Sequence, residues 1–363
     1  MNVAKPKCVG VLGAGQLALM LAEAATALDV AVVCAGQSGD CAERVAEVVV
    51  VDLDDQAQVA AFAERADVVT IESENIDASV LAGLNLAPNA RAIGIAQDRL
   101  LEKRFFEQCG IGCAPFLPVD SAEMLQSAVK QLGFPAILKT RRMGYDGKGQ
   151  IRLQSSEGLP TAFADLGGVP CILEGMVRFD AEVSLIAARG RAGEIVFYPL
   201  IENVHRDGIL RRSTVPFAGA THALQQQGET YLRRILEELD YIGVLAVEFF
   251  VVNGKLLANE MAPRVHNSGH WTIEGAKTSQ FENHLRAILG MELGSTESVP
   301  TVMLNCIGEM PSEQETSTTP AFHRHDYGKA GRPGRKVGHL TLAAGEREAI
   351  AHWYTRLNPE DQG

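Results

Sequence analysis

The chain has 363 residues, of which 46% are hydrophobic and 21% charged, and its formal net charge is −12. This length is enough for two or three domains, and the acidic balance argues against nucleic acid as a general partner. No apolar run reaches about 18 residues, so we expect no membrane partner. The N-terminus lacks a signal-peptide layout, and the seven cysteines are scattered. We therefore expect a cytoplasmic protein with reduced thiols.

The first part of the chain alternates short apolar runs with helical patterns. A helix is predicted over residues 16–28, which are rich in alanine and leucine. The apolar runs predicted to be strands are 8–12, 30–35, 47–52 and 67–72. Short buried strands separated by helices are typical of a doubly wound parallel α/β domain, with a boundary predicted near residues 95–100.

A glycine turn, GAGQLA at 13–18, follows the first predicted strand and opens the first helix. Such a turn lets the backbone approach a ligand, and free N–H groups at a helix start favour an anion. A dinucleotide site also needs an acid at the end of the second strand, where this chain has none, so a phosphate site or a plain turn remains. Glu72 and Glu74 follow another strand and are expected in the same crevice, with a solvated loop as the alternative.

A second glycine-rich segment follows Lys139, near the end of a strand predicted over 134–140. A lysine buried there needs an anionic partner, and Gly144, Gly147 and Gly149 form a loop that is able to cover a phosphate. The P-loop pattern is absent, and a glycine-rich hairpin tip is the alternative. A strand over 171–177 then offers backbone groups for an adenine edge, and Glu182 either holds a ribose or is an ordinary solvated glutamate.

Two glutamates lie in a hairpin predicted over residues 243–264. Register decides whether their carboxylates meet. A two-residue Asn-Gly turn would pair Glu248 with Asn259 and point Glu260 to the other face, whereas an odd-length loop with a glycine bulge would put both acids on one face. Two acids on one face favour a divalent cation shared with nucleotide phosphates. The alternative is a single buried acid paired with an arginine.

The loop after this hairpin is crowded with polar groups. Arg264, His266, Asn267 and His270 lie within residues 261–272, together with proline and glycine, and such a segment is poor core material. Next to phosphate chemistry, it is predicted to form a second-substrate site. After residue 290 the chain turns polar, and β-like character returns near 332–344, so a small third domain is predicted there.

In this order, Lys139, the loop GYDGKGQ (144–150), residues 174–177, Glu182, Glu248 and the pair Asn259 and Glu260 resemble the ATP-grasp superfamily. The longer segments are similar to the 5-(carboxyamino)imidazole ribonucleotide synthase family of purine biosynthesis. They are RRMGYDGKGQ (141–150), NVHRDGILRRS (203–213), APRVHNSGHWT (262–272) and RPGRKVGHL (332–340). Together they span nearly the whole chain.

This resemblance implies an α/β and α+β chain with the ATP-grasp fold. It implies a doubly wound parallel α/β domain over 1–97, an ATP-grasp domain of two lobes over 98–292, and a small β-rich C-terminal domain over 293–363. The implied activity is a ligase reaction, the ATP- and bicarbonate-dependent carboxylation of 5-aminoimidazole ribonucleotide through carboxyphosphate, in de novo purine synthesis. Mg²⁺ is the implied cofactor, and a homodimer is the implied assembly.

The resemblance also assigns residues. Those implied to contact ATP are Arg99, Lys139, Gly144, Tyr145, Asp146, Gly147, Lys148, Gly149, Gln150, Glu174, Gly175, Met176, Val177, Glu182, His205, Asn259 and Glu260. Those implied to hold magnesium are Glu248 and Glu260. Those implied to surround the imidazole ribonucleotide and bicarbonate are Gly13, Gln16, Glu74, Tyr145, Asp146, Arg264, His266, Asn267, Arg335 and Lys336. Lys139 and Arg264 are assigned to catalysis, and Asp146 or His266 to the amine proton.

The chain differs from the family pattern at a few positions. It reads GQLALM, with Ala18 and Leu19, where such enzymes commonly read GQLGRM, and it has Ser73 and Met143 where phenylalanine and glycine are common. The ATP and magnesium residues match. The alternatives are another ATP-grasp ligase, such as a formate-dependent purine transformylase or a biotin carboxylase relative, a nucleotide-binding homologue without activity, and a nicotinamide dehydrogenase.

Overall fold

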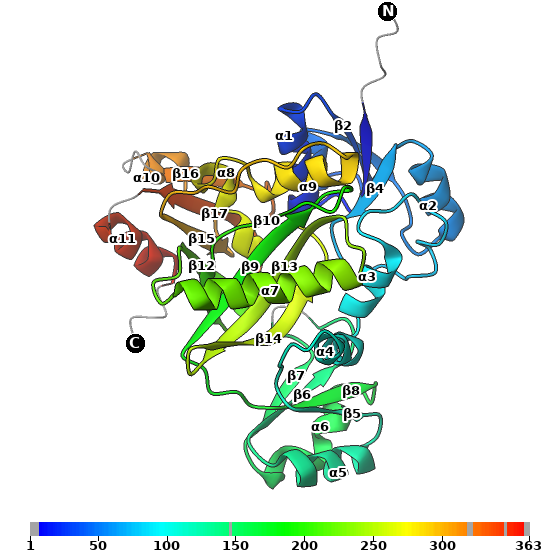
Figure 1. Ribbon diagram of the computed structural model, residues 1–363, viewed down its shortest axis with the longest axis vertical. Coiled ribbons are helices and arrows are strands. Elements are labelled where there is room, and N and C mark those ends of the chain that lie inside the picture. Colours follow the sequence, from blue (N-terminus) through cyan, green and yellow to red (C-terminus); the bar gives the residue numbers. More distant parts are fainter. Residues whose placement is uncertain (1–6, 145–146, 318–321, 345–346, 359–363) are drawn as a thin grey trace, which may run out of the picture.

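The computed structural model describes residues 7–144, 147–317, 322–344 and 347–358. Its N-terminal domain has a four-stranded sheet in the order β3-β2-β1-β4, with every neighbouring pair parallel (Figure 1). The strands are β1 (Cys8–Leu12), β2 (Ala31–Gly36), β3 (Glu47–Val50) and β4 (Val68–Ile71). Helices α1 (Gln16–Thr26) and α2 (Gln56–Ala63) contribute to different buried clusters. They therefore cover opposite faces, and the predicted doubly wound domain is confirmed.

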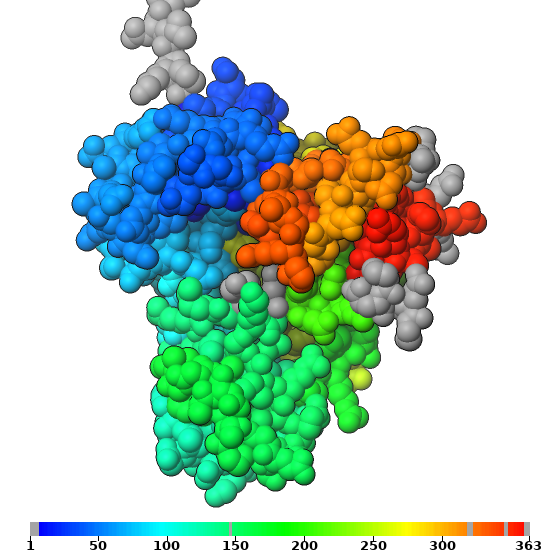
Figure 2. All heavy atoms as spheres, turned by 180° about the vertical axis from the view of Figure 1, so that it is seen from behind, coloured from blue at the N-terminus to red at the C-terminus, as the bar shows by residue number. Residues whose placement is uncertain are grey.

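Helices α3 (Ala90–Ala96) and α4 (Arg99–Gln108) lead into a small lobe with a four-stranded antiparallel sheet, in the order β5-β8-β6-β7. Its strands are β5 (Phe116–Val119), β6 (Ala136–Thr140), β7 (Gln150–Leu153) and β8 (Cys171–Gly175). Helices α5 (Ala122–Leu132) and α6 (Leu159–Asp165) pack against this sheet through one apolar cluster. Seen from behind, the lobe extends away from the rest of the molecule (Figure 2).

A nine-stranded sheet forms the body of the protein, in the order β14-β13-β9-β11-β12-β15-β17-β16, with β10 paired to β9. The strands before residue 290 are β9 (Ala181–Arg189), β10 (Ile195–Phe197), β11 (Ile201–Arg206), β12 (Ile209–Val215), β13 (Gly243–Val252) and β14 (Lys255–Ala262). Helix α7 (His222–Glu238) crosses one face (Figure 1), and the short α8 (Thr272–Gly275) and α9 (Gln280–Leu289) follow the hairpin.

The C-terminal segment continues this same sheet. Strands β15 (Thr301–Ile307), β16 (Phe322–Asp326) and β17 (Lys336–Ala343) are antiparallel to their neighbours, and β15 pairs with β12 of the preceding domain. The short α10 (Glu313–Thr316) and the longer α11 (Arg347–Leu357) complete the segment. The β-like character predicted near the C-terminus is therefore real, and the segment is joined to the body by backbone hydrogen bonds.

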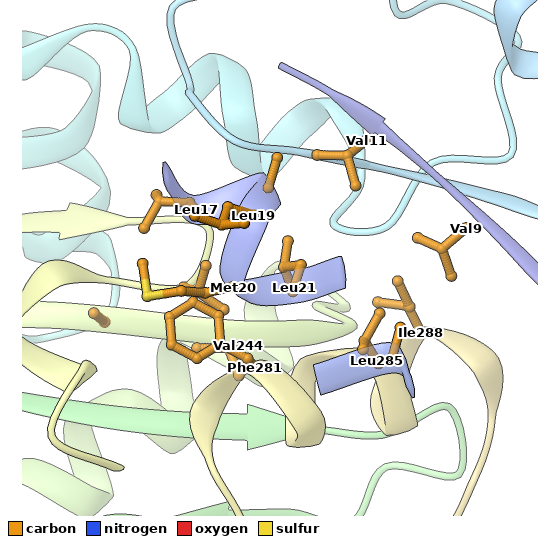
Figure 3. Packing of buried hydrophobic residues seen from close by; sticks show 14 of the residues in the cluster. Val9, Val11, Leu17, Leu19, Met20, Leu21, Val244, Phe281, Leu285 and Ile288 are labelled. Atoms are coloured by element: carbon orange, nitrogen blue, oxygen red, sulfur yellow. The ribbon is translucent and has the colours of Figure 1, made fainter. Parts of the chain in front are cut away.

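A buried seam joins the N-terminal domain to the large sheet. Figure 3 shows Leu17 and Leu21 of α1 in one cluster with Phe281 and Leu285 of α9. At the edge of the seam, the His284 ring accepts the Val244 N–H at 3.0 Å and lies 2.8 Å from the Thr70 hydroxyl of β4. Across the described part of the chain, no helix has both the length and the apolar character that crossing a bilayer requires.

Candidate active site

The hairpin of β13 and β14 brings the two predicted metal carboxylates together. It has a two-residue turn, since Val252 pairs with Lys255. The register expected for such a turn is nevertheless wrong, because a β-bulge interrupts the ladder: Phe249 pairs with Ala258, whereas Glu248 pairs with Glu260. Asn259 is the extra residue, and it returns Glu260 to the face of Glu248. The acids thus share one face, through a bulge and not through the turn.

The surroundings shift the pKa values of the two carboxylates in opposite directions. Burial raises the pKa of Glu248 to about 7, and Glu260 adds to this effect while His205 opposes it. Burial would also raise the pKa of Glu260, but the Arg99 guanidinium, 2.8 Å from its Oε2, lowers it to about 2. Both acids lie on the same face, as the metal-site prediction requires. The arginine partner of the alternative prediction is also present, because Arg99 pairs with Glu260.

This carboxylate pair fits a magnesium ion that is shared with a nucleotide. A cation there would favour the charged form of Glu248, against the burial and the neighbouring Glu260 carboxylate that raise its pKa. No cluster of three or more His, Cys, Asp or Glu side chains suited to a metal occurs within the ranges the structure describes. Mg²⁺ is typically bound by one or two carboxylates together with substrate phosphates, so two protein ligands are sufficient for that role.

Lys139 lies at the end of β6 with an anionic partner supplied by the protein. Its ammonium is 3.0 Å from Glu174 Oε2, and Lys103 is 3.6 Å from the same oxygen. Burial lowers the pKa of Lys139 and Glu174 opposes that shift, while the two lysines outweigh burial and lower the pKa of Glu174 to about 2. The predicted anion at this lysine is thus a buried carboxylate in this structure.

The other residues predicted to lie beside the adenine are at the end of β8 and just beyond it: Gly175, Met176 and Val177. The N–H groups of Gly175 and Met176 donate to the carbonyls of Pro115 and Pro135, at 2.8 and 3.1 Å. These two donors are therefore used inside the small lobe, whereas Val177 is half-buried beyond the strand.

The described residues of the glycine loop contact two parts of the site. Arg99 donates to the Gly144 carbonyl at 3.1 Å. Gly147 has φ +76°, and a Cβ on it would lie 2.6 Å from the Asp207 carbonyl oxygen, so the loop touches the turn between β11 and β12. Tyr145 and Asp146 lie outside the described residues. The remaining predicted loop residues, with their burial, are Lys148 (exposed), Gly149 (half-buried) and Gln150 (half-buried).

Glu182 and His205 meet on neighbouring strands of the large sheet. The strands β9 and β11 pair Glu182 with Asn203, and the His205 Nδ1 forms an ion pair with Glu182 Oε2. Burial disfavours a charged imidazole, but the hydrogen bond to Glu182 outweighs burial and raises the pKa of His205 to about 9. Two residues predicted to contact ATP are therefore adjacent and carry opposite charges.

The predicted second-substrate residues come from three parts of the chain. Arg264 donates to both Glu74 oxygens, from Nε at 2.6 Å and from Nη2 at 3.1 Å. His266 Nε2 is 3.5 Å from Glu248 Oε1, so this loop lies directly beside the metal carboxylates. Asn267 exchanges two amide hydrogen bonds with Asn305 of β15, at 3.1 and 2.8 Å.

His266 is neutral near neutral pH. Burial, followed by the charge of Arg264, lowers the pKa of its ring to about 3. Nδ1 lies 2.8 Å from the Ser268 hydroxyl and accepts the Ser268 N–H at 3.3 Å, while Nε2 faces Glu248.

The glycine turn of the N-terminal domain is filled by a side chain of the same domain. Glu72 accepts the N–H groups of Gly15 at 2.5 Å and Leu17 at 3.2 Å. A Cβ on Gly13, which has φ +120°, would meet Glu72 at 2.6 Å. Glu72 is therefore in the same crevice as the turn, as predicted, but it occupies the donors that a phosphate would use. Gln16 contacts Lys329.

Arg335 and Lys336 lie at the start of β17. Arg335 donates to the Ala330 carbonyl at 3.2 Å. Burial raises the pKa of Glu248 and lowers that of His266, and the Lys336 charge is a smaller effect that lowers both. The positions where this chain departs from the family pattern are also explained in part: Ala18 and Leu19 are buried in the seam, and Met143 has φ +62°, a conformation that favours glycine.

Four residues of this region were not predicted from the sequence. Lys103 and Glu102 of α4 contact the bulged strand, Lys329 contacts Gln16, and Asp98 holds Arg141. The signal for the first two was present: Glu102 and Lys103 are charged but lie beside the buried Phe105 and Phe106 of the same helix.

Comparisons with known proteins agree with this geometry. Residues 104–281 match the ATP-grasp domain, residues 6–97 the ribonucleotide synthetase pre-ATP-grasp domain, and residues 301–353 the phosphoribosylaminoimidazole carboxylase C-terminal domain. The fold and the site therefore define an ATP-grasp enzyme, and the predicted fold class is confirmed.

The relatives narrow this class further. The chain is 48% identical to the N5-carboxyaminoimidazole ribonucleotide synthase of Pseudomonas aeruginosa, over 94% of this chain and 96% of the relative. It therefore belongs to the N5-carboxyaminoimidazole ribonucleotide synthase family, and the predicted resemblance is confirmed.

Solved structures of this family superpose on the whole chain. The synthetase of Thermus thermophilus has a TM-score of 0.91 at 49% identity, covering 97% of this chain and 98% of that one. The Aspergillus clavatus enzyme, solved in complex with ADP and 5-aminoimidazole ribonucleotide, has a TM-score of 0.87 at 30% identity, covering 96% of each chain.

Proposed function

We propose that this chain is a ligase that carboxylates 5-aminoimidazole ribonucleotide, using ATP and bicarbonate, to give 5-(carboxyamino)imidazole ribonucleotide, ADP and phosphate in de novo purine synthesis. The observation that carries the proposal is the bulged hairpin, where Glu248 and Glu260 oppose each other and Arg99 lies beside them. Membership of the synthase family supports the choice of substrates.

The chemistry begins with an unreactive acid. Bicarbonate is a poor electrophile because hydroxide is a poor leaving group. Transfer of the γ-phosphoryl group of ATP to a bicarbonate oxygen gives carboxyphosphate and ADP. The exocyclic amine of the imidazole attacks that carbon, or carbon dioxide released from it, phosphate leaves, and the amine loses a proton. Catalysis of such a transfer rests mainly on positioning and charge neutralisation.

The proposed nucleotide site uses charges from both lobes. Lys139 and Arg99 would neutralise phosphate oxygens, and the loop with Gly144, Gly147, Lys148, Gly149 and Gln150 would cover them and exclude water. Magnesium held by Glu248 and Glu260 would supply positive charge to the β- and γ-phosphates. The remaining ATP contacts are assigned to the small-lobe end of the site and to β9, β11 and β14: Glu174, Gly175, Met176, Val177, Glu182, His205 and Asn259.

Arg264 is the proposed ligand of bicarbonate. In this structure its two parallel N–H bonds go to the Glu74 carboxylate, a planar group with the same two-oxygen edge that bicarbonate presents. Lysine lacks this paired geometry. Around the imidazole ribonucleotide we place Gly13, Gln16, Glu74, Tyr145, Asp146, His266, Asn267, Arg335 and Lys336, with Asp146 or His266 receiving the amine proton.

Phosphate release with each substrate omitted in turn tests the function. Turnover is expected only when ATP, bicarbonate, 5-aminoimidazole ribonucleotide and Mg²⁺ are all present. Formate in place of bicarbonate is the control, because a transformylase would use it. ADP binding without release of phosphate in the complete mixture would instead identify a nucleotide-binding homologue without activity.

We also propose a cytoplasmic location and a homodimer, both of which are expected from the family resemblance. Sedimentation equilibrium of the purified chain measures the assembly directly.

A further inference from the structure

One face of α4 contacts three successive residues of the bulged strand. Arg99, Glu102 and Lys103 are spaced i, i+3 and i+4, so they share a face of the helix. Lys103 Nζ donates to the Asn259 carbonyl at 2.8 Å, Arg99 pairs with the Glu260 carboxylate at 2.8 Å, and Glu102 Oε1 accepts the Met261 N–H at 2.6 Å. The helix thus holds the bulge on both sides of Glu260.

These contacts are buried and involve charged side chains. Glu102 is 2% exposed and Lys103 is 1% exposed, and such groups are almost never fully buried unless they are paired. A bulge disrupts the regular ladder and leaves its extra residue outside the pairing. A buried backbone group without a partner is destabilising. Because β14 is the edge strand of its sheet, the helix supplies partners to the outer edge of the strand at and beside the bulge.

Lys103 also reaches the small lobe. Its ammonium is 3.6 Å from Glu174 of β8, the carboxylate that holds Lys139 of β6 at 3.0 Å. A single side chain therefore connects the backbone of the bulge with the lysine proposed for the phosphates.

We propose that Glu102 and Lys103 are positioning residues that hold the bulge at Asn259 and so keep Glu260 opposite Glu248 for the magnesium nucleotide. This inference rests on the proposed function, because it assigns the carboxylate pair to that nucleotide. Neither residue touches substrate in this role; each acts on the backbone that carries Glu260.

The test compares two substitutions at one position. Glu102→Leu removes the acceptor for the Met261 N–H, whereas Glu102→Gln keeps Oε1. ADP affinity is measured by calorimetry with and without Mg²⁺. In the presence of Mg²⁺, Glu102→Leu is expected to weaken ADP binding by about 10–100-fold, which is the usual effect of losing a group that orients a metal ligand. Without Mg²⁺, the ADP affinity of this variant is expected to change by less than about threefold. Glu102→Gln is expected to behave like the wild type.

Phe105→Leu is the matched control, since Phe105 is buried in the same helix and forms none of these hydrogen bonds. It is expected to lower thermal stability and leave the Mg²⁺ dependence unchanged. Lys103→Met removes the contact to Asn259 and also the pairing with Glu174; as a second variant it is expected to show the same loss of binding in Mg²⁺.

Wild-type Mg²⁺ dependence in both Glu102→Leu and Lys103→Met would overturn this inference alone. A wild-type enzyme whose ADP affinity ignores Mg²⁺ would overturn the proposed function and the inference with it. If neither variant folds, hydrogen exchange of the Met261 amide in the wild type is the deciding measurement. Protection equal to that of neighbouring amides in the strand supports the inference. Exchange as fast as that of the amides in the turn at Asn253 overturns it.

Discussion

At the residue scale, several side chains predicted to bind charged ligands are paired with an opposite charge inside the protein. Removing a charge from water is unfavourable unless a partner compensates it. The buried charged side chains of this site therefore need partners of opposite charge within the protein when no ligand is bound. In the proposed function, binding of ATP or bicarbonate would exchange one partner for another. The pairs are Arg99 with Glu260, Lys139 with Glu174, Arg264 with Glu74, and His205 with Glu182.

The pair of His205 and Glu182 gives a pH-dependent prediction. The pKa of His205 is raised from 6.5 to about 9, so its stabilisation is fully present below the unfolded value and is lost as pH rises through about 9. Glu182→Gln is expected to destabilise the protein by up to roughly 3 kcal/mol near pH 6 and by much less above pH 9. Thermal denaturation at both pH values measures this difference.

The exposed Glu157 offers the control for that experiment. Glu157→Gln is expected to change the free energy of unfolding by less than about 0.5 kcal/mol at either pH. An equal loss of stability for Glu182→Gln at both pH values would contradict the assignment of the ion pair.

At the element scale, one extra residue and one glycine loop decide how the site is assembled. The bulge at Asn259 sets the face of Glu260. The glycine loop bridges to the opposite lobe, because Gly147 packs on the backbone of Asp207. Both features depend on contacts between elements and not on the propensity of the segments themselves.

Gly147→Ala tests the loop. A Cβ at this position would meet the Asp207 carbonyl at 2.6 Å, so the loop must move away from the β11–β12 turn, and ADP affinity is expected to fall about tenfold, as for a displaced binding loop. Gly254→Ala is the control, because Gly254 has a similar φ of +74° but open space around it. It should destabilise by roughly 1 kcal/mol without changing ADP affinity, as calorimetry would measure. Equal ADP affinities in both variants would contradict the loop contact.

At the scale of the whole molecule, the N-terminal domain, the large sheet and the C-terminal strands are held together by buried contacts. The seam of α1 and α9 is apolar, and β15 joins the C-terminal strands to β12. The proposed substrate site draws on all three parts, so their relative position is part of the site.

Leu285→Ala tests this coupling. Leu285 is fully buried in the seam, and truncation is expected to lower the free energy of unfolding by about 3 kcal/mol. The N-terminal domain and the large sheet should still unfold in one urea transition, followed by circular dichroism and by tryptophan fluorescence. Met124→Ala, at an exposed position of α5, is the control. A separate early transition for one domain would contradict the coupling.

Much of the local structure could be predicted from the sequence. The first strand matches its predicted range, and the predicted strands and helices of the first domain are present within a few residues. This succeeds because apolar periodicity and glycine turns act over short distances along the chain. The types and order of the motif residues are typical of the family, which is confirmed, and the roles assigned to them stay predictions.

Local patterns were therefore enough to identify the elements, the family and the types of residue at the site. The direction in which those side chains face, and what holds them, depends on contacts in the folded protein: the bulge that returns Glu260 to the side of Glu248, and the glutamate that fills the glycine turn. These contacts join segments that lie far apart along the chain. The backbone of the bulge is held by Lys103, 156 residues earlier, and no local pattern records a contact between segments that meet only when the whole chain folds.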